Sequence, residues 1–270
     1  MSKTAKTTRH SVAKLLGLIP NRLQLAGGWI DQPFVSRVNP KPPGSMVVVQ
    51  IEPNFRPMCR SGIASSTRMV AMELWNGRLP NRARETLVRE LYHAENTYKA
   101  EPSGSQDMIG LIYPGINRLD YDISHEGGVF PVHVESCTSR RVAHWLEHVL
   151  HLIPVEPRPE GYNPLVEKKL DPKWVARLGQ SGKDTFDAIV AMDSRALGKA
   201  INLGLKCWDV LLPQSMRHKV MKVDLLELAA AYQHDYLGAA YSGPGGGYLI
   251  VVSDEPVPGS FAVNVRTEPA

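Results

Sequence analysis

Ser61-Gly62-Ile63-Ala64-Ser65-Ser66-Thr67 carries the strongest signal in the sequence, because it stands where a turn enters a predicted helix over residues 65–76. Small residues allow backbone N–H groups to approach phosphate oxygens, and the N-terminus of a helix adds partial positive charge. Three consecutive hydroxyl groups offer the hard oxygen ligands that Mg²⁺ prefers. The segment lacks the G-x-x-x-x-G-K-[ST] pattern, so it is not a Walker-type loop. A phosphate cradle and a serine-rich helix cap both account for it.

A second glycine-rich segment, Ser242-Gly243-Pro244-Gly245-Gly246-Gly247, precedes the apolar run YLIVV. Three glycines in four residues cost backbone entropy beyond the need of a simple turn. Close approach to a ligand is one explanation, and a tight bend between a helix and a strand is the other.

Glu95 is the first of two acidic residues that stand between these segments. On a helix predicted over residues 81–100 it continues the apolar stripe of Leu87 and Leu91 at a spacing of four residues. A carboxylate on a core-facing stripe is costly unless it is paired or bound to a metal. Alternatively, the stripe drifts around the helix and leaves Glu95 at the rim, near Lys99.

Asp107 is the second, at the start of a short helix predicted over residues 104–113. The simple reading is an acidic residue that complements the helix dipole. The functional reading is a base, or a charge that orients an attacking hydroxyl group, since a helix N-terminus keeps such a carboxylate ionised.

Arg22 lies on a predicted strand that leads into Ala26-Gly27-Gly28-Trp29-Ile30-Asp31. A guanidinium suits two-pronged contact with phosphate, and a carboxylate accepts hydrogen bonds from sugar hydroxyl groups. A loop with a structural aspartate is the alternative.

Composition excludes several classes of protein. The chain has 270 residues, of which 43% are hydrophobic, and a net charge of +4 that suits an anionic small molecule but is too diffuse to indicate nucleic acid. Three widely spaced cysteines make no disulfide framework and favour a reducing cytoplasm. No apolar stretch approaches the length of a membrane span, so we expect no membrane partner.

Strands and helices are mixed without a regular βαβ rhythm, which predicts an α+β fold. The expected strands cover residues 18–25, 46–52, 116–122, 130–135, 248–253 and 261–266. Further helices are expected over residues 139–151, 171–178, 183–193, 195–206 and 222–235. Gly127-Gly128 marks a change of character and predicts two domains, residues 1–126 and 127–270.

Taken in order, the segments resemble the three signature motifs of the GHMP kinases, the family of galacto-, homoserine, mevalonate and phosphomevalonate kinases. Residues 20–31 resemble the first motif, in the form seen in fucokinases and heptose-phosphate kinases. Ser61–Thr67 resembles the second motif, usually GLGSS, with Ala64 in place of a usual glycine. Ser242–Gly247 resembles the third, usually GAGGGG, and departs from it at Pro244.

The resemblance implies ATP and Mg²⁺ as cofactors and assigns roles to individual residues. Asp107 and Arg22 would be catalytic, and Ser66 and Glu95 would hold Mg²⁺. The residues implied to bind ATP are Ser61, Gly62, Ile63, Ala64, Ser65, Ser66, Thr67, Gly243, Gly245, Gly246 and Gly247. The residues implied to bind the acceptor are Arg22, Gly27, Gly28, Asp31, Gln106 and Arg140.

The resemblance also implies a two-lobed fold, with an N-terminal lobe like domain 2 of ribosomal protein S5 and a ferredoxin-like C-terminal lobe. The expected protein is a cytoplasmic ATP-dependent kinase that transfers the γ-phosphoryl group to a hydroxyl group of a sugar or sugar phosphate, and a homodimer is one possible assembly. The short stretch between Asp31 and Ser61 supports an alternative, a catalytically degenerate ligand-binding protein of the same fold. A different nucleotide-dependent transferase is a third option.

Overall fold

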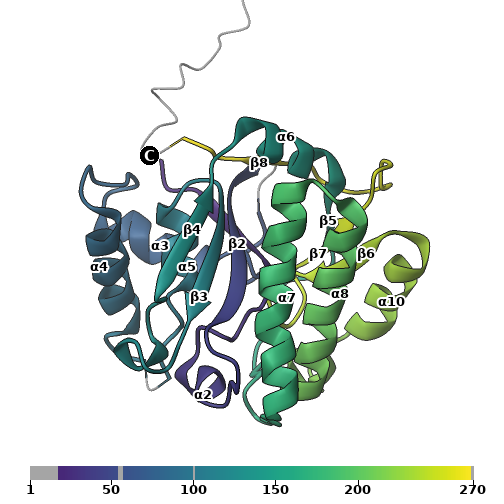
Figure 1. Ribbon diagram of the computed structural model, residues 1–270, viewed down its shortest axis with the longest axis horizontal. Helices are drawn as coiled ribbons and strands as arrows, with labels where there is room; N and C mark the ends of the chain where they lie inside the picture. Colours follow the sequence, from purple (N-terminus) through teal and green to yellow (C-terminus); the bar gives the residue numbers. More distant parts are fainter. Residues whose placement is uncertain (1–17, 54–56, 100, 269–270) are drawn as a thin grey trace, which may run out of the picture.

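The computed structural model describes residues 18–53, 57–99 and 101–268 (Figure 1). Its strands form one sheet of five strands and one of three, and every strand pair is antiparallel. Helices are interspersed among them without a regular strand–helix alternation. The predicted α+β fold class is therefore confirmed.

The five-stranded sheet has the order β1-β2-β3-β4, with β8 paired to the end of β2. Its strands are β1 (Asn21–Ala26), β2 (Gly44–Pro53), β3 (Ile116–Tyr121), β4 (His133–Cys137) and β8 (Val263–Val265). Every residue of β1 is buried, the polar Arg22 and Gln24 included. A strand buried on both faces must be covered by other elements on both sides.

The three-stranded sheet has the order β5-β7-β6. Its strands are β5 (Leu150–Pro154), β6 (Gly238–Tyr241) and β7 (Tyr248–Val252). The central strand β7 is the apolar run YLIVV and is fully buried, which agrees with its lack of polar alternation.

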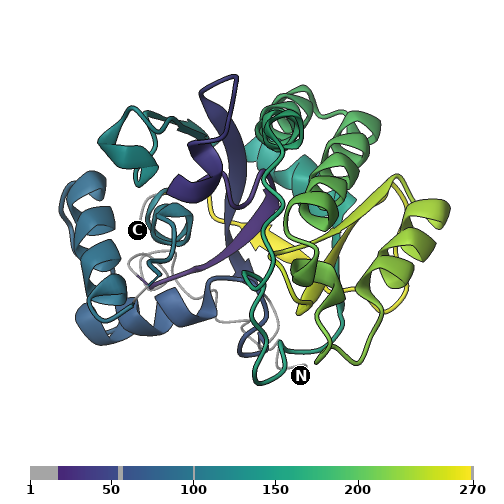
Figure 2. The ribbon, with the colours of Figure 1, turned by 90° about the horizontal axis from the view of Figure 1, so that it is seen from below.

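Helices cover the five-stranded sheet from two sides, as Figure 2 shows from below. On one side lie α3 (Ser65–Leu74), α4 (Arg84–Asn96) and α5 (Gln106–Ile112), of which α5 contacts β1 and β2. On the other lie α7 (Pro172–Ala191) and α8 (Ser194–Leu211). Among the described residues, no helix combines the length and apolar character needed to cross a membrane.

Helix α7 runs without interruption where the sequence predicted two helices, over residues 171–178 and 183–193. The predicted break falls at Gly179 and Gly182, which lie against the start of β2. A Cβ atom on Gly182 would come within 2.0 Å of the carbonyl oxygen of Ser45. These glycines therefore allow a close helix–sheet contact and do not end the helix.

Other elements differ from the prediction at their ends or were not predicted. Helix α6 (Arg140–Val149) stops before Leu150, where β5 begins, although one helix was expected over residues 139–151. Strand β6 is only four residues long, too short for an alternating pattern to show. The remaining helices are α2 (Pro33–Ser36), α9 (Gln214–Arg217), α10 (Leu225–Asp235) and the 3₁₀ turn η1 (Glu126–Gly128).

Strands β4 and β8 both follow the predicted domain boundary, yet they pair with β3 and β2 of the five-stranded sheet. The division into residues 1–126 and 127–270, and the two named lobes, stay predictions.

Candidate active site

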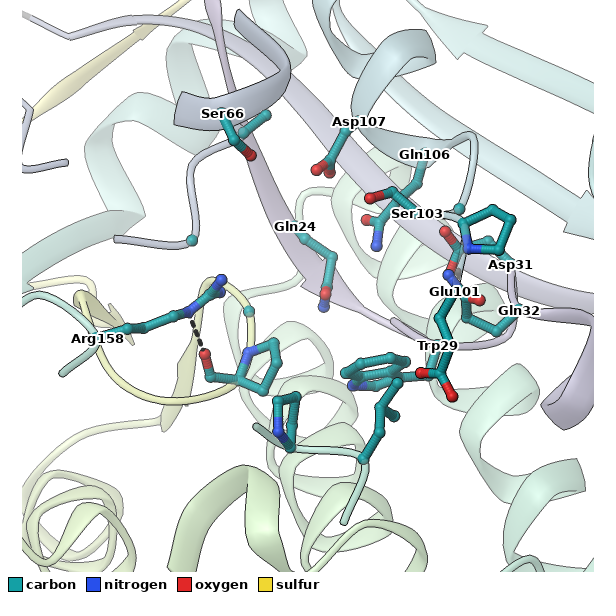
Figure 3. Close-up of a pocket in the computed structure, with 18 of the residues that line it drawn as sticks. Gln24, Trp29, Asp31, Gln32, Ser66, Glu101, Ser103, Gln106, Asp107 and Arg158 are labelled. Carbon is teal, nitrogen blue, oxygen red and sulfur yellow. Dashed lines mark hydrogen bonds between the residues drawn. The ribbon is translucent and has the colours of Figure 1, made fainter. Parts of the chain in front are cut away.

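A cavity of about 810 Å³ lies where α3, α5, the end of β1 and the turn 242–247 approach one another (Figure 3). Nine of the predicted site residues line it: Arg22, Asp31, Gly62, Ala64, Ser65, Ser66, Gln106, Asp107 and Gly243. They come from both ends of the chain. The fold therefore brings together most of the segments that the sequence singled out.

The turn 61–67 presents its backbone donors without internal partners. Two residues of this turn, Gly62 and Ala64, have a left-handed backbone conformation, with φ angles of 78° and 57°. No side chain caps α3 at its N-terminus, and within the described residues no acceptor pairs with the N–H groups of residues 61–67. Unpaired amides at the start of a helix make an anion site.

Asp107 is held in place by two groups from different elements. Arg22, on β1, forms an ion pair with its Oδ1 atom, and the Thr67 hydroxyl, on α3, donates to its Oδ2 atom at 3.3 Å. Gly110 makes room for Arg22, since a Cβ atom there would lie 2.1 Å from Arg22 Cγ. The carboxylate is thereby fixed at the wall of the cavity, close to Ser66 in Figure 3.

Arg22 is a buried cation with several charged neighbours. Burial lowers its pKa, the negative charges of Asp31 and Glu95 oppose that effect, and the positive charge of Arg158 adds to it. The negative charges of Asp31 and Glu95 thus favour the charged form of the Arg22 guanidinium.

Asp31 is only 1% exposed, and no group among the described residues donates a well-formed hydrogen bond to either carboxylate oxygen. Burial raises its pKa to about 6, while nearby backbone amides and the Arg22 charge offset part of the rise. Gly104 packs directly against it, since a Cβ atom there would lie 1.7 Å from Oδ2. Gln106 Oε1, also at the cavity, has no partner either.

Glu95 is buried, as the apolar stripe predicted, but it does not line the cavity. Its Oε1 atom accepts from Lys99 Nζ at 2.7 Å and from the Ser103 hydroxyl at 3.3 Å. Its Oε2 atom is buried, and no group in the described ranges donates a hydrogen bond to it. Both interpretations of the sequence thus hold in part, because Glu95 is buried and also pairs with Lys99.

The turn 242–247 packs against the turn 61–67. The Ser242 hydroxyl donates to the carbonyl oxygen of Gly62 at 3.0 Å, and a Cβ atom on Gly247 would lie 2.1 Å from the carbonyl oxygen of Ser61. A Cβ atom on Gly245 would strike the ring of Tyr162. The glycines therefore let two turns and an aromatic ring come together.

Most backbone donors of this second turn are already used. The N–H groups of Gly243, Gly245 and Gly247 donate to the carbonyl oxygens of Tyr241, Ser215 and Glu156, respectively. Pro244 has no N–H group. The turn shapes the cavity but has few donors left for a ligand.

The structure leaves some predicted site residues away from the cavity lining. Arg140 has an 80% exposed side chain and pairs with Glu268. Gly27 and Gly28 instead pack against Met46 and Gln24. Besides Glu95, the others that do not line the cavity are Ser61, Ile63, Thr67, Gly245, Gly246 and Gly247, and these six lie in or beside the two turns.

Sequence reasoning missed the connection between β5 and α7, which contributes Arg158, Tyr162 and Lys168 to the cavity. Prolines flank Arg158 on both sides, and they restrict the backbone to extended conformations. That pattern marks a stiff connection, but nothing in it says which surface the arginine approaches.

Basic groups outnumber acidic groups around the cavity. Three carboxylates line it, from Asp31, Glu101 and Asp107, against five basic side chains. The basic residues are Arg22, Arg37, Arg60, Arg158 and Lys168. The surplus of positive charge suits a ligand that carries several negative charges.

No protein-family model and no curated protein sequence matches the chain. Solved structures do match. A D-glycero-D-manno-heptose 1-phosphate kinase from Bacteriodes thetaiotaomicron is 14% identical, with 92% of this chain and 95% of that chain covered and a TM-score of 0.58. Galactokinase from Lactococcus lactis, solved with galactose, is 13% identical, with 88% and 85% covered and a TM-score of 0.59.

Mevalonate kinase from Methanococcus jannaschii is 11% identical, with 87% and 88% of the two chains covered and a TM-score of 0.55. These matches span nearly the whole of each kinase, so the likeness covers the complete fold and not one shared motif. The protein therefore has the GHMP kinase fold.

Proposed function

We propose that the protein is an ATP-dependent kinase that transfers the γ-phosphoryl group to a hydroxyl group of a sugar or sugar phosphate. One observation carries the proposal: the unpaired N-terminus of α3, the fixed carboxylate of Asp107 and the unpartnered carboxylate of Asp31 line the same cavity. The first fits phosphate and the other two fit a hydroxyl-bearing acceptor.

The phosphate end of the cavity is formed by the turn 61–67. Its unpaired N–H groups and the hydroxyl of Ser66 offer donors to phosphate oxygens. Phosphoryl transfer needs positioning and neutralisation of charge more than covalent help from the protein. A preformed set of backbone donors meets that need, because it does not reorganise during the reaction.

The acceptor end contains polar atoms that lack partners. Among the described residues, no group donates a well-formed hydrogen bond to the buried carboxylate oxygens of Asp31 or to the Oε1 atom of Gln106. An unpaired buried acceptor is costly, and each hydroxyl group of a sugar can donate one hydrogen bond. A polyhydroxyl acceptor would satisfy these atoms, so its binding would recover part of that cost.

Asp107 is the residue we assign to the attacking hydroxyl group. Its carboxylate can accept the hydroxyl proton or orient the oxygen toward phosphorus as the new O–P bond forms and the bond to the leaving ADP oxygen breaks. The neighbouring guanidinium of Arg22 stabilises the charged form of the Asp107 carboxylate. A carboxylate stabilised in this way is a weak base, so we assign Asp107 to orienting the hydroxyl group more than to removing its proton.

Mg²⁺ would be held by Ser66 and Glu95, and when bound it neutralises phosphate oxygens. The Oε2 atom of Glu95 and the hydroxyl of Ser66 are hard oxygen donors of the kind the ion prefers, but only Ser66 lines the cavity. Within the described ranges no group of three or more His, Cys, Asp or Glu residues is arranged for a metal. The donor set thus suits an ion that arrives with the nucleotide, since Mg²⁺ keeps waters and phosphate ligands.

The test is release of ADP from Mg·ATP across a panel of sugars and sugar phosphates. The wild type is expected to turn over one class of acceptor, and Asp107→Asn to lose at least about 100-fold in kcat while its affinity for ATP stays the same, because the carboxylate contacts the acceptor. Asp235→Asn, an exposed residue on α10, is the control and should behave as the wild type. Equal turnover by Asp107→Asn would remove Asp107 from the mechanism.

The degenerate ligand-binding protein is the other candidate, and the pairing of Lys99 with Glu95 favours it, because an ammonium group already occupies one oxygen of the predicted metal ligand. This candidate binds an acceptor but releases no ADP with any member of the panel. Cytoplasmic location and a homodimer stay predictions.

A further inference from the structure

Arg158 lies outside every motif of the sequence and reaches the cavity between the two glycine-rich turns. Its Nε atom donates to the carbonyl oxygen of Pro244 at 2.6 Å, the bond drawn in Figure 3. A Cβ atom on Gly62 would lie 3.2 Å from its Nη2 atom, and one on Gly243 would lie 2.9 Å from it. One guanidinium thus packs against both turns.

The backbone holds Arg158 in this position from the side of Arg60. The N–H group of Arg158 donates to the carbonyl oxygen of Arg60 at 3.0 Å, and Arg60 Nη2 donates to the carbonyl oxygen of Pro159 at 2.8 Å. These two bonds tie the connection between β5 and α7 to the loop that precedes the turn 61–67. The backbone at Arg158 is therefore held in place by hydrogen bonds to a neighbouring loop, and this fixes where its side chain starts.

The charge of Arg158 has no acidic partner within the described part of the chain. Burial lowers its pKa and the charge of Arg60 adds to that effect, while Tyr162 is the one neighbour that opposes it. Among the described residues only Nε has an acceptor, so the terminal nitrogens of this cavity-lining guanidinium keep N–H groups that no described protein group accepts. A largely buried cation in this state carries a desolvation cost that a bound anion would offset.

The turn 242–247 has few backbone donors left for a ligand, and an arginine beside it can supply donors in their place. Its Pro244 lacks an N–H group, and three of its four glycines donate to carbonyl oxygens of the protein. On this side of the cavity the backbone therefore offers few donors to phosphate. The guanidinium of Arg158 adds donors on this side, and the Pro244 carbonyl oxygen orients it.

We propose that Arg158 binds the polyphosphate chain of the nucleotide, together with the backbone N–H groups of residues 61–67. The inference rests on the proposed kinase function for the identity of the nucleotide, but the chemistry that Arg158 recognises is the polyphosphate itself. An arginine offers phosphate two parallel N–H donors in a fixed planar fork, whereas a lysine acts as a point charge.

The test is isothermal titration of the full-length protein with inorganic tripolyphosphate and, separately, with Mg·ATP. Arg158→Gln is expected to weaken binding of both ligands by roughly 10- to 100-fold, since charge-assisted hydrogen bonds are lost. Arg158→Lys should recover part of the affinity because it keeps the charge. Arg195→Gln, an exposed arginine on α8, is the matched control and should bind both ligands as the wild type does.

The melting temperature without ligand separates a binding role from a structural one. Removal of an unpaired, largely buried charge should leave the apo protein at least as stable as the wild type. A large loss of stability in Arg158→Gln, with no recovery of binding in Arg158→Lys, would assign the residue to the packing of the turns and overturn the proposal.

The two ligands also separate the inference from the kinase function. If Arg158→Gln binds both ligands as tightly as the wild type, the inference about Arg158 is wrong and the kinase function is untouched. If the wild type binds tripolyphosphate but not Mg·ATP, the kinase function is wrong, and weakened tripolyphosphate binding by Arg158→Gln still supports the anion site. A wild type that binds neither ligand contradicts both.

Discussion

At the scale of single residues, Asp31 is an acid whose charged form the fold disfavours. Its pKa of about 6 lies above the ordinary value of 3.8, and burial is the main cause. At pH values between these two, Asp31 keeps its proton in the folded state and has released it in the unfolded state. Stability contributed by Asp31 is therefore present at low pH and is lost as the pH rises through this window.

Asp31→Asn should remove this dependence. At pH 7.5 we expect the variant to gain up to about 3 kcal/mol in its free energy of unfolding, because the shift is roughly two units and each unit is worth about 1.4 kcal/mol. The gain should shrink toward pH 4. Urea unfolding of wild type and variant at several pH values measures it, with Asp235→Asn as the exposed control; parallel curves for Asp31→Asn and wild type would contradict the burial argument.

Glu95 is the predicted Mg²⁺ ligand, and substitution of this residue tests that role. Glu95→Gln should raise the Mg²⁺ concentration needed for half-maximal turnover by about tenfold or more, because a neutral amide is a poorer ligand than a carboxylate. Glu90→Gln is a matched control, since Glu90 lies on the same helix and pairs with Arg82 at the surface. Identical metal titrations for the Glu95 variant and the wild type would argue that Glu95 only anchors Lys99.

At the scale of elements, the junction between the two glycine-rich turns decides the shape of the cavity. Gly247 has a left-handed φ of 89°, and the carbonyl oxygen of Ser61 fills the place of a Cβ atom. Gly77 has a similar φ of 80°, but a Cβ atom there would meet nothing closer than 4.0 Å. The pair separates the cost of the backbone conformation from the cost of the close contact.

Gly77→Ala should lose about 1 to 2 kcal/mol of stability, the cost of a left-handed residue with a side chain. Gly247→Ala should lose at least about 2 kcal/mol more, because the two turns must also move apart. Urea unfolding measures both, and titration with Mg·ATP should show weaker binding only for the Gly247 variant. Equal losses in stability would mean that the contact between the turns is easily relaxed.

At the scale of the whole molecule, the cavity is made by parts of the chain that belong to different sheets. The turn 61–67 leads into α3 beside the five-stranded sheet, whereas the turn 242–247 joins β6 to β7 of the three-stranded sheet. A ligand that touches both turns binds only when the two are docked. Ligand binding should therefore stabilise the entire fold.

Mg·ATP at about 100 times its dissociation constant is expected to add about 2.7 kcal/mol to the free energy of unfolding. For a chain of this size that corresponds to a rise of several degrees in melting temperature. Differential scanning fluorimetry measures it, with adenosine as the ligand that lacks phosphates. No rise at millimolar Mg·ATP would favour the degenerate ligand-binding protein.

Much of the local structure was predictable because it depends on neighbouring residues. The glycine-rich turns, the start of α5 near Asp107 and the apolar strand β7 lie where composition and periodicity placed them. Helix α7 was predicted as two helices, because a glycine within a helix and a glycine between helices look alike in the sequence. What identifies Gly182 as a glycine within a helix is its close contact with the sheet, which the sequence does not show.

The sequence alone determined which segments could carry phosphate and acid chemistry, since left-handed turns, hydroxyl groups and carboxylates are properties of a few consecutive residues. Only the tertiary structure decided that Arg22 holds Asp107 and that Arg158 lies between the two turns. Arg22 and Asp107 are 85 residues apart, and the Nε atom of Arg158 reaches a carbonyl 86 residues away. Contacts over such separations are set by how the sheets and helices pack, and no local pattern encodes that packing.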